Sequence, residues 1–223
     1  MNPDQKLWNQ QLQGLRRALS RPEGYQEAIE LFLSQHAMVH SAKMARSKLW
    51  SFEDEVFQNM TEDAIRCIPP NCEHSVAWCI WHIARIEDVT MNLLVAGSPQ
   101  VAQRDNWLER IKVSVRDTGN TMDKVGVANL SATIDVKALR AYRVAVGRRT
   151  REIVQRLEPA DLKRKIAPVR LQEVLKEGAV VEAARDLIDY WGNRTVAGLL
   201  MMPATRHNFV HLNEALRVKN KCR

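Results

Sequence analysis

Two histidines near the end of the sequence have the spacing of a metal-chelating pair. His207 and His211 are four residues apart, so on a helix they lie about 40° apart on one face, separated by about one turn. Two imidazoles in that arrangement can bind one cation. Leu200, Ala215 and Val218 fall on the same side of such a helix. This neighbourhood directs the pair toward the protein interior and predicts a buried metal site.

A third histidine, His82, lies in the centre of an apolar helical stripe. With about 100° per residue, Trp78, Ile86, Val89 and Leu93 all point close to the direction of His82. A buried imidazole must find a partner or lose hydration energy. A single inward histidine is more often a hydrogen-bonded core residue than a ligand. His82 therefore indicates a metal only in combination with the pair described above.

Two more histidines, His36 and His40, face inward on another predicted helix, among Ile29, Phe32, Leu33 and Met44. Five inward-facing histidines in one small protein leave two interpretations open. One is a metal centre, and the other is a set of separately hydrogen-bonded core residues.

Composition favours helices over sheets as the elements that position these residues. The chain has 223 residues, which makes one domain the default, and 45% are hydrophobic, enough for a real core. Only 9 glycines and 8 prolines occur, too few for the many turns of a sandwich or barrel. The net charge of +7 is spread along the chain, so it permits contact with nucleic acid without arguing for it.

The periodicity predicts an all-α, up-and-down four-helix bundle with an extra N-terminal helix and a long connection over 98–134. Residues 1–24 are expected to form the N-terminal extension, and residues 25–223 the metal-binding bundle. A connection as long as 98–134 is often functional. The predicted helices cover 4–19, 25–49, 75–96, 136–157, 171–190 and 203–219.

The sequence also predicts a cytoplasmic protein. No apolar run approaches the roughly 18 residues that span a bilayer, and no signal peptide is visible at the N-terminus. The four cysteines have no regular spacing and are expected to be reduced thiols.

Two segments resemble motifs of the DinB/YfiT-like metalloenzyme family. The block SVAWCIWHIARIED over residues 75–88 resembles the family's second-helix motif, and RHNFVHLNE over residues 206–214 resembles its final-helix HxxxH. The likeness covers roughly residues 25–218. It implies a four-helix bundle that binds a divalent metal, zinc or nickel, through three histidines: His82, His207 and His211.

The resemblance leaves two roles open. His40 is a candidate for a fourth metal ligand or for a hydrogen-bonding neighbour of the site. Many family members have Gly-Gln after the second histidine of the final helix, where this chain has Asn213 and Glu214 two residues beyond His211. Glu214 is therefore the candidate catalytic acid/base, with a supporting hydrogen-bond acceptor or an exposed helix-end carboxylate as the alternatives.

Several family members resemble thiol S-transferases, which implies a metal-dependent transferase acting on a small-molecule substrate with a low-molecular-weight thiol. Three histidines leave coordination positions open, as in catalytic rather than structural sites. An open position can lower the pKa of a thiol or activate water for hydrolysis. Two alternatives remain: a non-enzymatic, metal-stabilised stress or scaffold protein, and a basic nucleic-acid-binding module.

A second apolar face on the last helix needs a cover. Phe209, Leu212 and Leu216 lie opposite or lateral to His207, and a helix that is apolar on two sides must bury both. The candidates are the N-terminal extension, which carries Trp8 and Leu15, and a second copy of the chain in a homodimer.

Overall fold

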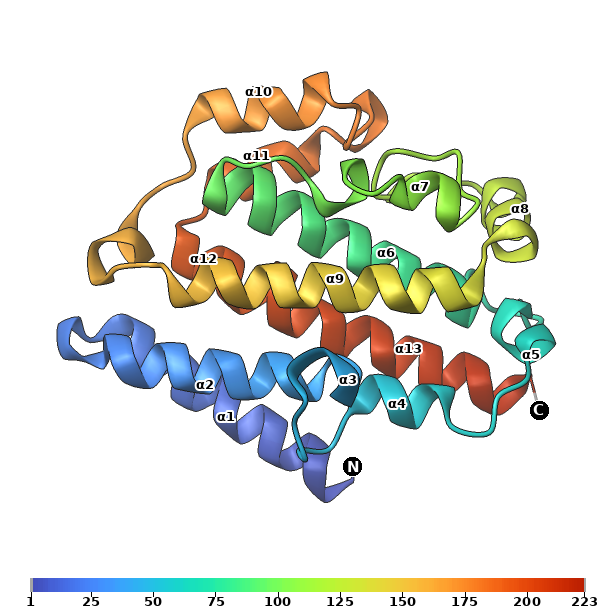
Figure 1. The fold of residues 1–223 in the computed structure, drawn as a ribbon, viewed down its shortest axis with the longest axis horizontal. Coiled ribbons are helices and arrows are strands. Elements are labelled where there is room, and N and C mark those ends of the chain that lie inside the picture. Colours follow the sequence, from blue (N-terminus) through green and yellow to red (C-terminus); the bar gives the residue numbers. More distant parts are fainter. Residues whose placement is uncertain (1, 223) are drawn as a thin grey trace.

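The computed structural model describes residues 2–222, which form helices joined by loops and contain no β-sheet. This confirms the predicted all-α class. Four long helices lie side by side: α2 (Tyr25–Met38), α6 (Val76–Asp88), α9 (Val136–Gln155) and α13 (His207–Lys221) (Figure 1).

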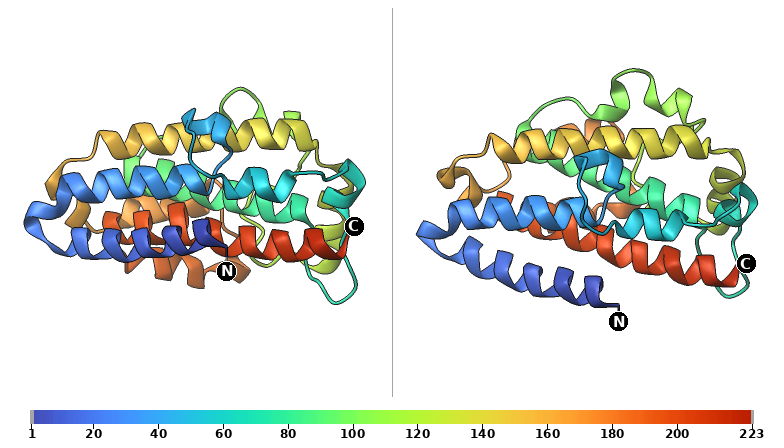
Figure 2. Two further views of the ribbon diagram at one scale, coloured as in Figure 1. Left: turned by 90° about the horizontal axis from the view of Figure 1, so that it is seen from below. Right: turned by 60° about the horizontal axis from the view of Figure 1, so that its bottom comes forward.

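Shorter helices surround these four. Helix α1 packs along α2 at one side of the molecule, whereas α10 and α11 lie at the opposite side (Figures 1 and 2). Within the described chain, no helix is both long and apolar enough to cross a membrane. The remaining α-helices are α1 (Pro3–Ser20), α3 (Ala42–Ala45), α4 (Phe52–Phe57), α5 (Glu62–Arg66), α7 (Trp107–Arg110), α8 (Lys124–Thr133), α10 (Pro168–Lys176), α11 (Asp186–Gly192) and α12 (Val196–Met201).

The directions of the long helices differ from simple up-and-down alternation, because α6 and α9 run parallel. Ser75, which begins α6, bonds Ser131 just before α9 (Oγ to Oγ, 2.7 Å). At the other end, Arg149 of α9 donates to Asn92, which follows α6. A chain that leaves the end of one parallel helix must return the length of the bundle to begin the next. The long connection over 97–135 is this return.

Side-chain caps fix where the helices begin. The Ser75 hydroxyl accepts from the amide of Trp78 at the start of α6, and Asp135 accepts from the amide of Ala138 at the start of α9. Such caps satisfy amides that have no partner inside the helix.

Two predicted helices are shorter in the structure. The one expected over 25–49 ends at Met38, and the chain resumes as α3 and α4, with Ser51 capping α4. The one expected over 171–190 divides into α10 and α11. Gly178 stands in the gap with φ of +66°, a conformation that suits glycine and ends a helix.

The final helix is preceded by two further helical segments. Helix α12 runs into a π-helical turn, Met202–Arg206, and α13 begins at His207. Pro203 has no amide hydrogen to donate within this turn, while the Thr205 hydroxyl donates to the carbonyl of Leu200. Helix α6 likewise continues into a π-helix, Val89–Ala96. Single π turns inside helices are frequent at functional sites.

The N-terminal helix covers the second apolar face of α13. The Trp8 ring stacks on Phe209 with ring centres 4.0 Å apart, and its indole N–H donates to the carbonyl of Gln35 on α2. Leu15 is fully buried. Helix α1 thus supplies the predicted cover, and this face gives no support to the predicted homodimer.

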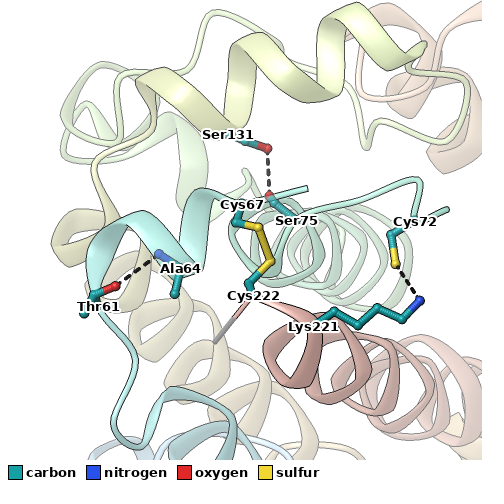
Figure 3. Close-up of a disulfide and its surroundings, with 8 residues drawn as sticks. All are labelled: Thr61, Ala64, Cys67, Cys72, Ser75, Ser131, Lys221 and Cys222. Atoms are coloured by element: carbon teal, nitrogen blue, oxygen red, sulfur yellow. Dashed lines mark hydrogen bonds between the residues drawn. A yellow bond between two sulfur atoms is a disulfide. The ribbon is translucent and has the colours of Figure 1, made fainter. Parts of the chain in front are cut away.

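The prediction of four reduced cysteines is wrong for two of them. Cys67, after α5, is joined by a disulfide to Cys222 at the end of α13 (Figure 3). Cys72 and Cys79 are free. The two bonded residues are 155 positions apart in sequence, so no local spacing could reveal the pair. Disulfides are typical of oxidising compartments, and the reduced-thiol argument for a cytoplasmic location therefore fails.

Candidate metal centre

Three imidazoles converge between α6 and α13. His82 comes from the middle of α6, and His207 and His211 come from the first turns of α13. The ring centres are 5.0 Å (His82 to His207), 4.8 Å (His82 to His211) and 4.6 Å (His207 to His211) apart. One nitrogen of each ring lies within 4.8 Å of the others. The three residues that the sequence singled out are thus brought together.

The separations of these rings fit a shared metal ion. An imidazole bound to zinc at 2.0–2.1 Å places its ring centre roughly 3.2 Å from the ion. Ring centres 4.6–5.0 Å apart then correspond to angles of about 90–105° at the ion. Three ligands at such angles occupy one side of an ion and leave the other side open.

Hydrogen bonds set which nitrogens face the centre. His82 donates from Nδ1 to the carbonyl oxygen of Thr118 (2.5 Å), and His211 donates from Nδ1 to Glu214 (2.8 Å). Each ring therefore keeps an unprotonated Nε2, the atom that binds a metal. Among the described residues, Nδ1 of His207 is buried without a hydrogen-bond partner. A cation bound at this nitrogen would give it a partner.

Burial keeps two of these imidazoles neutral. It lowers the pKa of His82 to about 3, helped by the neighbouring His211. Burial also lowers the pKa of His207 well below its usual value, with His82 and His211 adding to the effect. A metal binds the neutral form of imidazole, so protons compete weakly for this site.

A cavity of about 540 Å³ opens onto the three histidines. Its walls come from the loop before α6, from α6 itself, from the long connection, from α8 and from α13. The lining residues are Glu73, His74, Trp78, His82, Gly119, Asn120, Met122, Asp123, Lys124, Val127, His207 and His211.

The long connection holds the site as well as joining two helices. Thr118 supplies the carbonyl that orients His82. Gly119, the next residue, has φ of +76°, and a Cβ there would lie 2.5 Å from the Trp81 ring. Only glycine fits this position without displacement of the loop or of Trp81.

Glu214 lies behind the histidines rather than in the cavity wall. One carboxylate oxygen accepts from His211 (2.8 Å) and the other pairs with Nδ1 of His74 (2.7 Å). Burial alone would raise the pKa of Glu214, but the hydrogen bonds from His211 and His74 outweigh it and hold the pKa well below its usual range. This position suits a supporting acceptor, the second of the roles left open by the sequence.

His40 lies in a different cluster, which is fully buried. His36 and His40 both donate from Nε2 to Glu87 (2.8 and 2.9 Å). Glu87 also accepts from the Thr150 hydroxyl and the Asn208 amide, each at 2.7 Å. The structure therefore does not bring His40 to the other three predicted ligands.

A third group combines Cys79, His211 and Glu214, whose ligand atoms approach one another. Burial raises the pKa of the Cys79 thiol well above its usual value, and the nearby Glu214 raises it further. Cys79 therefore remains protonated at neutral pH, whereas a metal ligand must be a thiolate.

Two residues that lie next to the site, Thr118 and His74, were not predicted from the sequence. Thr118 contacts His82 through its backbone carbonyl, and a backbone contact cannot be predicted from a pattern of side chains. His74 continues the spacing of Trp78 and His82, four residues at a time. That regularity was a usable signal, but His74 lies outside the apolar stripe that defined the helix.

Fold and site together define a class: an all-helical protein in which a histidine of one central helix meets an HxxxH pair of the last. The sequence pattern of the DinB superfamily matches residues 48–214, most of the chain and all three of these histidines. The chain belongs to the DinB superfamily. No curated protein matches it.

Proposed function

We propose that this protein binds one divalent transition-metal ion through His82, His207 and His211, and that it is a metal-dependent thiol S-transferase. The observation that carries the proposal is the convergence of three imidazoles, with ring centres 4.6–5.0 Å apart, in the wall of a cavity of about 540 Å³.

The chemistry follows from the donor set. Three neutral imidazoles leave a divalent ion with its charge uncompensated and with open positions, so it can lower the pKa of a bound thiol. Zinc and nickel both suit imidazole ligands. The cavity adds the apolar side chains of Trp78, Met122 and Val127 for an uncharged electrophile, beside the polar Asn120 and Lys124.

The metal assignment is tested by elemental analysis of protein purified without a nickel resin. We expect about one ion per chain, and most of it lost in His82→Ala, His207→Ala or His211→Ala. His40→Gln is the matched control, because His40 belongs to the Glu87 cluster and should not change the metal content. Full occupancy in a His82→Ala/His211→Ala double variant would contradict the assignment.

The transferase activity is tested with 1-chloro-2,4-dinitrobenzene and a panel of low-molecular-weight thiols. Thioether formation should require the metal, disappear on chelation and return when zinc or nickel is added back. Metal binding without thioether formation would favour the metal-stabilised scaffold instead.

A further inference from the structure

His74 stands at the outer end of a stack of three rings that begins at the metal centre. Its imidazole lies on Trp78, with ring centres 3.6 Å apart and planes 7° from parallel. Trp78 lies on His82 in turn, at 4.6 Å and 11°. His74 lines the same cavity as His82, and its side chain is 18% exposed. It is the one histidine of this cavity that the three-histidine group does not include.

One carboxylate orients both His74 and a metal-site histidine. The two oxygens of Glu214 each face one ring nitrogen, Nδ1 of His211 and Nδ1 of His74. A carboxylate that bridges two imidazoles accepts from each of them, so Nδ1 of His74 carries the proton of the hydrogen bond. Neutral His74 therefore has its lone pair on Nε2. A carboxylate that fixes the tautomer of an imidazole in this way is the arrangement that prepares histidine to accept a proton.

We propose that His74 is the general base of this site and takes the proton from the thiol that enters the cavity. This proposal rests on the proposed function. The S–H bond breaks, its proton goes to Nε2 of His74, and the electron pair stays on sulfur. The thiolate then forms the C–S bond with the electrophile, the leaving group departs with its electron pair, and His74 returns its proton to solvent.

The other ionisable groups of the cavity are less suited to this task. Glu73 and Lys124 are exposed to solvent. The Asp123 carboxylate accepts from the Gly126 amide and caps α8. The charged and titratable groups that surround His74 are Glu73 on its own loop, Asp123 and Lys124 at α8, His82 on α6, and His207, His211 and Glu214 on α13.

The test measures how fast a thiol reaches the metal rather than turnover. Protein loaded with cobalt is mixed rapidly with 2-mercaptoethanol, and the sulfur-to-cobalt charge-transfer band is followed in time. We expect His74→Ala to slow the appearance of the band at least tenfold at neutral pH, because general-base assistance typically contributes 10²–10⁴-fold. The final amplitude and the cobalt content should stay unchanged.

Two further variants separate proton transfer from shape. His74→Phe keeps a ring on Trp78 but has no base, so it should be as slow as His74→Ala. Added imidazole should accelerate His74→Ala, where it has space, and leave His74→Phe slow. Cys72→Ser is the control on the same loop, because Cys72 is free and does not line the cavity, and it should react like the wild type.

The outcomes distinguish this inference from the function on which it rests. A wild-type band with unchanged rates in both His74 variants overturns the general base and leaves the metal-bound thiol intact. Absence of any band in the wild type overturns both.

Discussion

The Glu87 carboxylate of α6 connects its helix to α2, α9 and α13 through hydrogen bonds. A carboxylate offers about four lone-pair positions, and Glu87 uses them for His36, His40, Thr150 and Asn208. Burial alone would raise the pKa of Glu87, but His40 and His36 outweigh it and lower the pKa well below its usual value. Because donors occupy all four positions of the carboxylate, this cluster is better described as a buried anion held by four hydrogen-bond donors than as a second metal site.

This arrangement predicts that protonation of His40 destabilises the fold. Burial, helped by the charge of Arg143 and opposed by Glu87, lowers the pKa of His40 to about 3. In the unfolded chain the pKa is about 6.5. Between these values only the unfolded chain binds the proton, so stability is fully present above about pH 6.5 and declines as the pH falls.

When the pH of metal-free protein is lowered from about 7.5 to 5, the titration of His40 should decrease the unfolding free energy by about 2 kcal/mol. His40→Gln retains a donor for Glu87 but does not titrate. Its loss of stability over that interval should therefore be smaller by about 2 kcal/mol, as measured by urea unfolding at the two pH values. Equal losses in both proteins would mean that His40 is already charged in the folded state.

The predictability of single residues depended on their position relative to a periodic pattern. His82, His207 and His211 lie on stripes whose direction can be calculated from the sequence, so their inward orientation was expected. That the three share one site was implied by the resemblance to the family motifs. His40 lies beyond the end of α2, where helical angles no longer apply. Its placement in the Glu87 cluster therefore could not be read from spacing.

At the scale of helices, α9 approaches the His40 segment so closely that a side chain is excluded. A Cβ on Gly147 would lie 2.8 Å from Nδ1 of His40 and 2.8 Å from the Met44 side chain. Glycine inside a helix normally costs up to about 1 kcal/mol relative to alanine. Gly147 lowers the intrinsic stability of α9 but allows this helix to pack closely against the segment that follows α2.

Gly147→Ala should consequently destabilise the protein, by about 1–3 kcal/mol, because the overpacked contact outweighs the gain in helix propensity. Gly198→Ala on α12 is the matched control. A Cβ there meets only the flexible Arg194 side chain, at 3.3 Å and beyond, so it should leave stability unchanged or raise it by up to about 1 kcal/mol. Chemical denaturation measures both, and a stabilised Gly147→Ala would contradict the close approach.

Helix starts were more predictable than helix ends and directions. Helix α9 begins at Val136, the residue at which the sequence predicted a helix start, and Asp135 caps it there. Such a start is predictable because capping depends on neighbouring residues. The end of α2 and the parallel course of α6 and α9 depend on contacts between distant segments. Helix α8 lies within 98–134, the stretch that the sequence predicted only as a long connection.

For the whole molecule, the disulfide between Cys67 and Cys222 restrains the end of α13, the helix that carries His207 and His211 of the candidate metal centre. Closing so long a loop reduces the conformational entropy of the unfolded chain and should stabilise the fold by about 5 kcal/mol. A Cys67→Ser/Cys222→Ser variant should lose about that much unfolding free energy.

Cys72→Ser serves as the control, since Cys72 is free and its replacement should change stability by less than about 0.5 kcal/mol. Thiol titration of denatured protein should find two reactive groups before reduction and four after it. Four reactive thiols before reduction, or a double variant as stable as the wild type, would count against the bond.

The same disulfide determines what a protease can release from the protein. Residues 67–222 form a closed ring, and the ring contains the long connection, the three converging histidines and Glu214. A protease that cuts one exposed peptide bond in that connection opens the ring without separating the pieces. Both fragments stay in one molecule, so a single cut should pass unnoticed on a non-reducing gel and divide the chain in two only after reduction.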